Sequence, residues 1–302
     1  MKKLGMPYMG SKQKLSKQIV DFILADNPEC KYIYDLFGGG GAISFEFLQR
    51  QQVNKVFYNE LNTSITELLI DLLANGITDK YYQWVDRDTF NAHKNDLTWF
   101  GGLLQTCWSF GNNQKDYLFG KNIEEHKRLL HEIVVNKCAK SREIFPLKFD
   151  DEIFNFETVR KRRLAVMRVV KKSSRCDLEQ LQRLQQLQQL EQLQQLERLE
   201  RLERLENLNI TNASYDVVEI KTPINQTIIY LDPPYNNTNK YKEDLCHNAL
   251  KDYIKNSQYK IYVSGYDNVY DLNCVLEMSH RSTLSSTNNS KKTIEKLYCN
   301  KL

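Results

Sequence analysis

The sequence of 302 residues lacks the long apolar stretch that a membrane-spanning helix requires. Such a helix takes about 20 predominantly apolar residues, and no apolar run of about 18 occurs. The first residues, MKKLGMPYMGSKQK, contain two early lysines but no apolar segment after them, so we expect no signal peptide. These absences predict a cytoplasmic protein with no membrane partner.

Paired cysteines are also missing. The seven cysteines are scattered and form no Cys-x-x-Cys pair, and the five histidines are equally dispersed. Neither a disulfide framework nor a zinc site has the spacing it requires, so we expect reduced cysteines and no metal. The composition, with 41% hydrophobic and 26% charged residues, is typical of a globular protein. This length allows one large domain, or a larger domain with a smaller insert.

Net charge is small, but its distribution is uneven. The formal charge of +4 permits a polyanionic partner without demanding one. Residues 160–175, RKRRLAVMRVVKKSSR, contain eight basic residues and no acid. Two compatible interpretations follow: a solvated face of an amphipathic helix, and contact of Arg162 and Arg163 with phosphate groups.

Residues 178–208 differ from the rest of the chain. Leucine occurs there at every third position, eleven times, with Gln, Glu and Arg between. The composition favours a helix, but three residues advance an α-helix by about 300°, so the leucines spiral around it. The alternating spacing of a coiled coil is absent, and 3₁₀ helices rarely exceed a turn. We interpret the segment as a repeat-expanded helical connector without catalytic residues; a dimerising surface is the alternative.

A glycine-rich loop follows the first predicted strand. Residues 31–50, KYIYDLFGGGGAISFEFLQR, predict a strand, a turn of four glycines and a helix. Such a loop lets a nucleotide-like ligand approach the backbone at the end of a parallel strand. The dinucleotide-binding fingerprint is incomplete, because Ile43 replaces its third glycine. The next predicted strand ends at Glu60, which is either placed to bind ribose hydroxyls or a plain surface carboxylate.

The most specific motif is Asp232-Pro233-Pro234-Tyr235, which ends a predicted buried strand. The two prolines fix a rigid turn that presents a carboxylate, a carbonyl and an aromatic ring. The exocyclic amine of adenine is a poor nucleophile because its lone pair is delocalised into the ring. Asp232 and the Pro233 carbonyl can accept both N–H bonds and localise that lone pair, while Tyr235 can stack on an extruded base. A methyl sulfonium supplies the electrophile without a metal.

Over most of its length the chain resembles the N6-adenine DNA methyltransferases whose cofactor motif precedes the target-recognition region and the catalytic motif. Residues 6–12, MPYMGSK, look like the N-terminal motif of the family, and residues 35–40, DLFGGG, look like its cofactor loop. Residues 260–266 and 295–298 resemble two later strands. The cofactor-binding residues that the resemblance implies are Tyr8, Lys12, Asp35, Phe37, Gly38, Gly40, Glu60 and Asp232. The catalytic residues that it implies are Asp232, Pro233, Pro234 and Tyr235.

The resemblance also implies a fold, a cofactor and a partner. The fold is an α/β, Rossmann-like sheet, mostly parallel with one reversed strand, carrying an inserted, largely helical target-recognition domain. The cofactor is S-adenosyl-L-methionine, and the partner is double-stranded DNA from which the target base is flipped. We expect a monomer or weak dimer, in a setting that includes restriction–modification. The long leucine-triplet run departs from the family pattern.

The domain boundaries follow from the spacing of the motifs. About 190 residues separate the glycine loop from the catalytic tetrapeptide, too many for one βα unit. We therefore predict a catalytic domain from 1–79 and 209–302, a recognition insert from 80–176, and the connector at 177–208. Residues 109–113 are the first candidates for DNA contact, because Asn can read adenine edges and aromatic rings can fill the gap left by a flipped base. Trp99, Trp108 and Phe110 are individually better core candidates. The predicted DNA-contacting residues are Ser109, Asn112, Asn113, Lys115, Arg162 and Arg163.

Three classes of function are consistent with these motifs. The first is methylation of adenine N6 in DNA. The second is another aminomethylation with the same catalytic logic, on cytosine N4, RNA or protein glutamine. The third is a catalytically silent DNA-binding module, against which the intact tetrapeptide argues.

Overall fold

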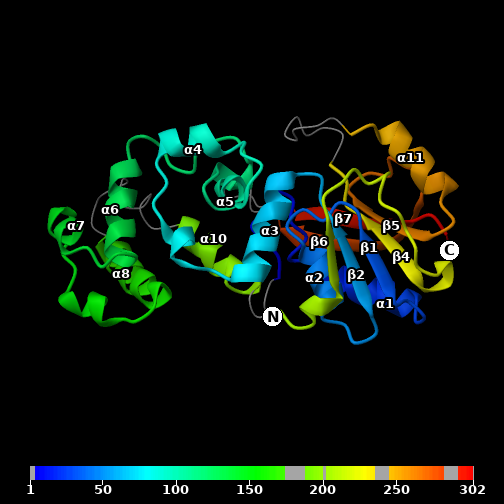
Figure 1. The fold of residues 1–302 in the computed structure, drawn as a ribbon, viewed down its shortest axis with the longest axis horizontal. Helices are drawn as coiled ribbons and strands as arrows, with labels where there is room; N and C mark the ends of the chain where they lie inside the picture. Colours follow the sequence, from blue (N-terminus) through cyan, green and yellow to red (C-terminus); the bar gives the residue numbers. More distant parts are fainter. Residues whose placement is uncertain (1–3, 174–187, 200–201, 235–244, 282–291, 302) are drawn as a thin grey trace. The chain divides into compact units, whose positions relative to one another are not determined.

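The chain folds into two compact units (Figure 1). The computed structural model describes residues 4–173, 188–199, 202–234, 245–281 and 292–301. The first unit consists of Met1–Thr66 and Arg201–Leu302, and the second, Glu67–Glu200, is inserted into it. These boundaries differ from the predicted ones, because helix α3 (Thr63–Asn75) runs from the first unit into the second.

The first unit is built on a seven-stranded sheet in the order β3-β2-β1-β4-β5-β7-β6. Strand β7 runs antiparallel to both of its neighbours, β5 and β6, and the other described pairings are parallel. This arrangement confirms the predicted Rossmann-like fold, mostly parallel with one reversed strand. The strands are β1 (Tyr32–Asp35), β2 (Lys55–Asn59), β3 (Leu208–Thr211), β4 (Thr227–Leu231), β5 (Lys260–Gly265), β6 (Asn273–Arg281) and β7 (Lys292–Cys299).

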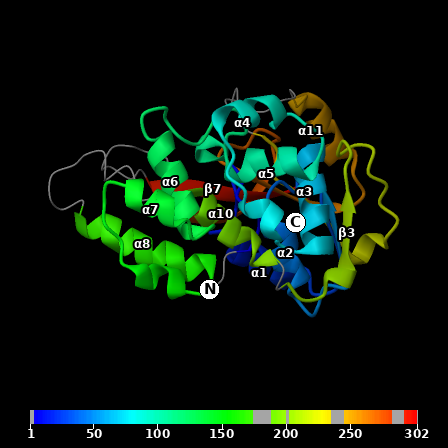
Figure 2. The same ribbon diagram turned by 60° about the vertical axis from the view of Figure 1, so that its left-hand side comes forward.

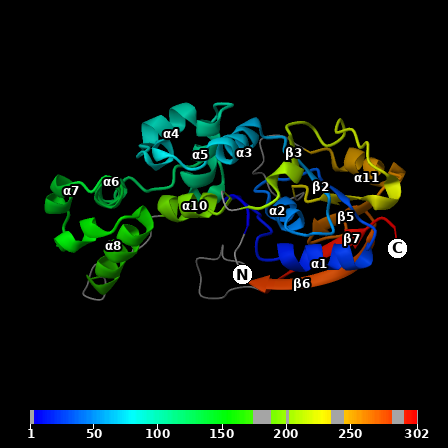
Figure 3. The same cartoon turned by 60° about the horizontal axis from the view of Figure 1, so that its bottom comes forward.

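Helices cover both faces of this sheet (Figure 3). On one face α1 (Ser16–Asp26) and α2 (Ala42–Leu48) pack in a cluster that includes Ile228 and Tyr230 of β4. On the other, α11 (His247–Asn256) packs in a cluster with Ile229 and Leu231. Alternate side chains of a strand point to opposite faces, so a strand covered on both sides is buried along its length and predominantly apolar. This arrangement explains why all of TIIYL in β4 is buried.

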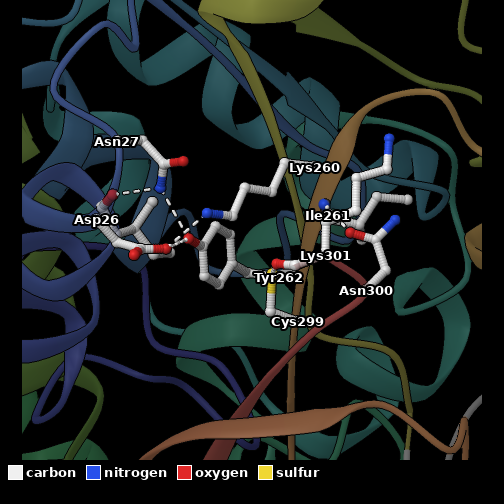
Figure 4. Close-up of polar contacts among 9 residues, drawn as sticks. Asp26, Asn27, Lys260, Ile261, Tyr262, Cys299, Asn300 and Lys301 are labelled. Atoms are coloured by element: carbon white, nitrogen blue, oxygen red, sulfur yellow. Dashed lines mark hydrogen bonds and ion pairs between the residues drawn. The ribbon is translucent and has the colours of Figure 1, made fainter.

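A group of polar side chains fastens the end of α1 to the start of β5 (Figure 4). Asp26 accepts a hydrogen bond from Lys260 Nζ at 2.7 Å and another from the Tyr262 hydroxyl. These two donors, Lys260 first, hold the pKa of Asp26 below its usual range. Asn27 Nδ2 donates to the same hydroxyl at 2.7 Å, and Asn300 Oδ1 accepts from a main-chain N–H of β5 at 2.8 Å. The cluster fixes α1 and therefore the segment that precedes it.

The second unit is largely helical, as predicted (Figure 2). Its core contains a ring cluster in which Trp108 packs edge-on against Trp84, and Trp84 stacks on Phe119. Trp108 is fully buried, whereas Phe110 is 62% exposed, so the core interpretation holds for the first residue and not for the second. The helices are α4 (Arg87–His93), α5 (Trp99–Cys107), α6 (Glu124–Val134), α7 (Ala139–Ile144), α8 (Val159–Ser173) and α10 (Gln188–Leu196), with 3₁₀ turns η1 (Asp79–Tyr82), η2 (Phe110–Asn112) and η3 (Asp151–Asn155).

The described part of the leucine-triplet segment is not a separate connector. Helix α10 has contacts with α5, α8 and η1, and its leucines Leu190, Leu193 and Leu196 are buried. The described residues of the helix are Gln188–Leu196. Over that length leucines that each lag by about 60° spread across only about 120°, which is one face. These described residues therefore pack into the second unit, because their three leucines share one face of the helix.

One buried residue of α10 is a predicted weak point. Gln189 is fully buried, and neither its Oε1 nor its Nε2 has a hydrogen-bond partner among the described residues. An unsatisfied buried amide costs about 1–3 kcal/mol. We expect Gln189→Met, which keeps the length of the side chain, to raise the thermal midpoint by a few degrees. Gln258→Met, at an exposed position of the first unit, is the control and should change nothing. A lower midpoint for Gln189→Met contradicts this account.

None of the described helices is long and apolar enough to span a membrane.

Candidate active site

Acidic side chains gather at one edge of the sheet. Asp35 is the last residue of β1, and Glu60 and Asp232 directly follow β2 and β4, so all three lie at the carboxyl edge of parallel strands. Strand β7 runs the other way and pairs Lys296 with the end of β5, which brings the neighbouring Glu295 to the same edge. Without a compensating group, so many carboxylates in one place repel one another.

The compensating charge comes from the N-terminal segment. Lys12 Nζ lies 2.7 Å from Asp232 Oδ1 and 3.6 Å from Glu295 Oε1. Lys12 and Glu295 are buried, with side chains 6% and 1% exposed, and Asp232 is 20% exposed. Burial lowers the pKa of Lys12, but attraction to Asp232 and Glu295 raises it by more. The net pKa lies above the usual value, so the ammonium stays charged. Lys12 thus holds two acids from different strands at one point.

Asp232 is an unusually weak acid despite this partner. Burial raises the pKa of Asp232 to about 6; the Glu295 charge adds to that rise, and Lys12 opposes it. Tyr230, two residues earlier in β4, bonds its hydroxyl to Ser264 Oγ at 2.5 Å. Near neutral pH Asp232 is therefore mostly ionised, because its pKa of about 6 lies slightly below that pH.

The glycine loop is closed by Glu60. The Gly39 N–H donates to Glu60 Oε2 at 2.7 Å, and the Asn62 N–H donates to Oε1 at 2.8 Å. Gly39 has a positive φ of 48°, which glycine adopts without strain. A Cβ on Gly40 would lie 2.7 Å from the Met6 carbonyl oxygen, so the N-terminal segment packs directly on the loop.

Aromatic rings border the same loop. A Cβ on Gly38 would lie 2.3 Å from the Tyr58 ring, and one on Gly39 would lie 3.1 Å from the ring of Tyr8. Phe37 stacks on Tyr215 with ring centroids 5.4 Å apart. The structure therefore brings the predicted cofactor residues together at this edge of the sheet.

Asp35 has a carboxylate oxygen that no described residue satisfies. It is 1% exposed; its Oδ2 accepts from Ser44 Oγ at 2.7 Å, and its Oδ1 is buried without a hydrogen-bond partner. Burial raises the pKa of Asp35 to about 7, and the charges of Asp232 and Glu60 contribute to that rise. A buried, unpaired acceptor suits a ligand that carries a cationic or N–H donor.

This raised pKa gives a pH-dependent prediction for Asp35→Asn. Between about pH 4 and pH 7 the folded chain keeps a proton on Asp35 that the unfolded chain has released. The stability linked to that proton is therefore lost as the pH rises through this window. As the pH rises from about 4 to 7, the free energy of unfolding of Asp35→Asn should increase relative to that of the unsubstituted chain by about 1 kcal/mol per pH unit.

Urea unfolding of both proteins at pH 5, 6 and 7 measures this gain, because groups that titrate in both cancel in the difference. A difference that does not change with pH contradicts the raised pKa of Asp35. The measurement uses the chain without a methyl donor.

The comparison with known families agrees with this geometry. A family model for D12 class N6 adenine-specific DNA methyltransferases matches residues 8–298. The chain belongs to this family. It is therefore an enzyme that methylates adenine in DNA. The match supports the first of the three classes of function, and it supports neither the other aminomethylations nor the silent DNA-binding module. No curated protein matches the chain.

Three residues of the predicted catalytic tetrapeptide directly follow β4. Asp232 and Pro234 are partly exposed and Pro233 is buried, while Tyr235 lies outside the described residues. Sequence reasoning missed Glu295, which it placed on a late strand without a role. Its acidic type at the start of a segment that resembles a late strand of the family was the only available signal, since its contact with Lys12 depends on the reversed direction of β7.

Two loop residues that the sequence suggests for DNA contact, Ser109 and Asn113, form hydrogen bonds within the second unit instead. Ser109 is fully buried; its Oγ donates to the Gln105 carbonyl at 2.6 Å and accepts from the Gln114 N–H at 3.1 Å. The DNA-binding prediction for Ser109 is therefore corrected, because its hydroxyl lies in the core. Asn113 holds the turn by accepting from the Lys115 N–H at 3.0 Å. Asn112 is partly exposed and Lys115 is exposed.

The prediction of phosphate contact for Arg162 and Arg163 is likewise corrected. Arg162 is 4% exposed, and its guanidinium donates to main-chain carbonyls that include those of Val134 and Val135, at the end of α6. Carbonyls at a helix end have no partner within the helix, so this arginine satisfies them. Arg163 is 8% exposed and pairs with Glu191 at 2.6 Å. Among the residues of α8 whose burial is described, the exposed basic ones are Arg160, Lys161, Arg168 and Lys171.

Proposed function

We propose that this methyltransferase transfers the methyl group of S-adenosyl-L-methionine to the N6 amine of an adenine flipped out of double-stranded DNA. The observation that carries the proposal is the position of Asp232, which ends a buried strand beside the glycine loop and is held by Lys12 at 2.7 Å. Such an acceptor, fixed next to a nucleotide-type loop, is what an adenine amine requires.

The residues at the edge of the sheet fit the cofactor. The unpaired Asp35 Oδ1 is suited to accept from the ammonium group of the methionine moiety. Glu60, at the end of β2, is suited to bind the ribose hydroxyls, and the glycines leave room for the backbone to approach the ligand. When bound, S-adenosyl-L-methionine supplies a methyl group on a positively charged sulfur.

The residues of the chain then act on the amine. Lys12 binds Asp232 Oδ1, so Oδ2 is the oxygen left to accept an N–H bond from the base, and the Pro233 carbonyl accepts the second. Both bonds localise the nitrogen lone pair toward the methyl group. With a pKa of about 6, Asp232 can also hold the proton that the methylated amine releases. Lys12 keeps the carboxylate ionised for this role and is a positioning residue.

The second unit is the proposed target-recognition domain. It presents Phe110, 62% exposed, next to Asn112 and Lys115. An exposed aromatic ring beside polar side chains suits a duplex from which a base has been flipped out, because the ring can fill the gap that the base leaves. The exposed basic residues of α8 suit phosphate groups, which give affinity without sequence preference.

One experiment tests the proposed reaction. DNA of random sequence is incubated with the protein and S-adenosyl-L-methionine labelled in its methyl group, then analysed by mass after digestion to nucleosides and mapped at base resolution. We expect labelled N6-methyladenine at a defined sequence, and none when the donor is omitted. Asp232→Ala is the control for contaminating activity. Labelled N4-methylcytosine, or no labelled nucleoside, would overturn the proposal.

A further inference from the structure

A polar cavity lies within the second unit, between α10 and the 3₁₀ turn η2. Its volume of about 240 Å³ is enough for several water molecules or for the edge of one base. Amide side chains predominate in its lining. The lining residues are Gly111, Asn112, Gln188, Glu191, Gln192 and Gln195.

The triplet repeat itself builds one wall of this cavity. The four lining residues of α10 have the spacing i, i+3, i+4 and i+7, which places them within an arc of about 100° on one face of the helix. The leucines at 190, 193 and 196 occupy the opposite arc, and each is at most 1% exposed. The buried leucines therefore anchor the helix, and the amides project from a fixed backbone.

The cavity carries little net charge despite its acid. Glu191 pairs with Arg163 at 2.6 Å, and Arg163 also donates to Gln194 at 3.3 Å. This pairing compensates the one acidic group in the lining, which would otherwise repel a phosphate backbone. It also gives Arg163 a role that the sequence does not reveal, namely to hold the polar face of α10 in place.

The lining contains an acceptor without a partner. Gln192 Oε1 is buried and receives no hydrogen bond from a described residue. Across from α10, Gly111 has a φ of 59°, and a Cβ added to it would meet nothing within 4 Å. The cavity is therefore open beside Gly111, and the side-chain oxygen of Gln192 has no N–H donor among the described residues. Both features point to a ligand with a flat polar edge.

We propose that this amide-lined cavity reads the edge of an adenine base in the DNA substrate, so that part of the leucine-triplet segment determines sequence preference. The proposal rests on the proposed role of the second unit in DNA binding. An amide side chain presents a donor and an acceptor side by side, which matches N7 and the N6 amine of adenine. Gln192 Oε1 accepts from that amine, and Phe110, exposed next to Gly111, offers an aromatic face beside the cavity.

The test compares methylation maps of variants on DNA with random sequence around the target. For Gln192→Ala we expect preference at one base pair of the recognised sequence to fall at least about tenfold, since a bidentate pair contributes about 1–3 kcal/mol of discrimination. The dependence of binding on salt should not change, because no phosphate contact is removed. Arg198→Ala is the matched control, being exposed on the same segment and outside the lining, and it should keep the preference.

A second variant keeps the test decisive if Gln192→Ala folds poorly. Gln192→Glu preserves the shape but offers only acceptors, so preference at the same base pair should shift from adenine toward cytosine. An unchanged map in both variants, or an equal loss of affinity for all sequences, overturns the proposal. If the unsubstituted chain forms no N6-methyladenine, the proposed function fails instead, so the two failures are distinguishable.

Discussion

Asp232→Ala should lower the rate of methyl transfer at least about a hundredfold, which is the scale on which one positioned polar group usually contributes to catalysis. The substitution removes the acceptor that polarises the adenine amine and leaves Pro233 as the only remaining acceptor of the pair. It should leave cofactor affinity largely intact, because Asp35 and Glu60 stay in place at the neighbouring strand ends. The loss is therefore expected in kcat and not in donor binding.

Single-turnover assays with labelled donor, combined with calorimetric titration of the donor, separate these effects. Asp252→Ala is the matched control, because Asp252 is exposed on α11 and belongs to the same unit. It should retain full activity. Near-normal turnover of Asp232→Ala would remove Asp232 from the mechanism. In the unsubstituted enzyme, activity should fall as the pH drops below about 6, because protonated Asp232 no longer accepts from the amine.

Lys12→Met should reduce both activity and stability. Removing one partner of a buried ion pair leaves uncompensated charge and costs about 3–5 kcal/mol. Here it leaves Asp232 and Glu295 facing each other, which raises the pKa of Asp232 further. At pH 7 we expect kcat/KM to fall more than about tenfold. The acid limb of the pH–rate profile should move to higher pH, with partial recovery of activity in alkali.

The shift of the pH profile distinguishes this role from a purely structural one. A pH–rate profile of the same shape with a lower plateau would mean that Lys12 only supports the fold. If the single variant is too unstable to assay, Lys12→Met combined with Glu295→Gln removes one of the two acids. That double variant should recover stability relative to Lys12→Met alone, which shows the coupling between the two residues.

The sequence by itself determines the parts of this enzyme that rest on local constraints. Two prolines must end a strand wherever they follow one, so the turn at Asp232 is visible in the order of residues. A strand covered on both faces is predominantly apolar, and TIIYL in β4 follows this pattern. The four successive glycines mark a loop packed so closely by Met6 and Tyr58 that side chains do not fit. The family resemblance rests on these same local features.

Only the tertiary structure decides which distant groups meet. Lys12 and Asp232 are 220 residues apart, and Glu295 joins them because β7 is inserted in reverse next to β5. No local pattern records the order or direction of strands in a sheet, so the contact of Lys12 with both Asp232 and Glu295 does not follow from the residues alone; of the three, the family resemblance places only Lys12 and Asp232 in one site.

The same reason explains the arginines and the leucine triplets. Arg162 has the composition of a solvated basic face, yet the unsatisfied carbonyls at the end of α6 draw its guanidinium inward. The leucine spiral predicts no single packing face over the whole run, yet the three leucines in the described residues of α10 share one face, which packs against α5 and α8. Burial depends on where neighbouring elements stop, which the tertiary structure sets.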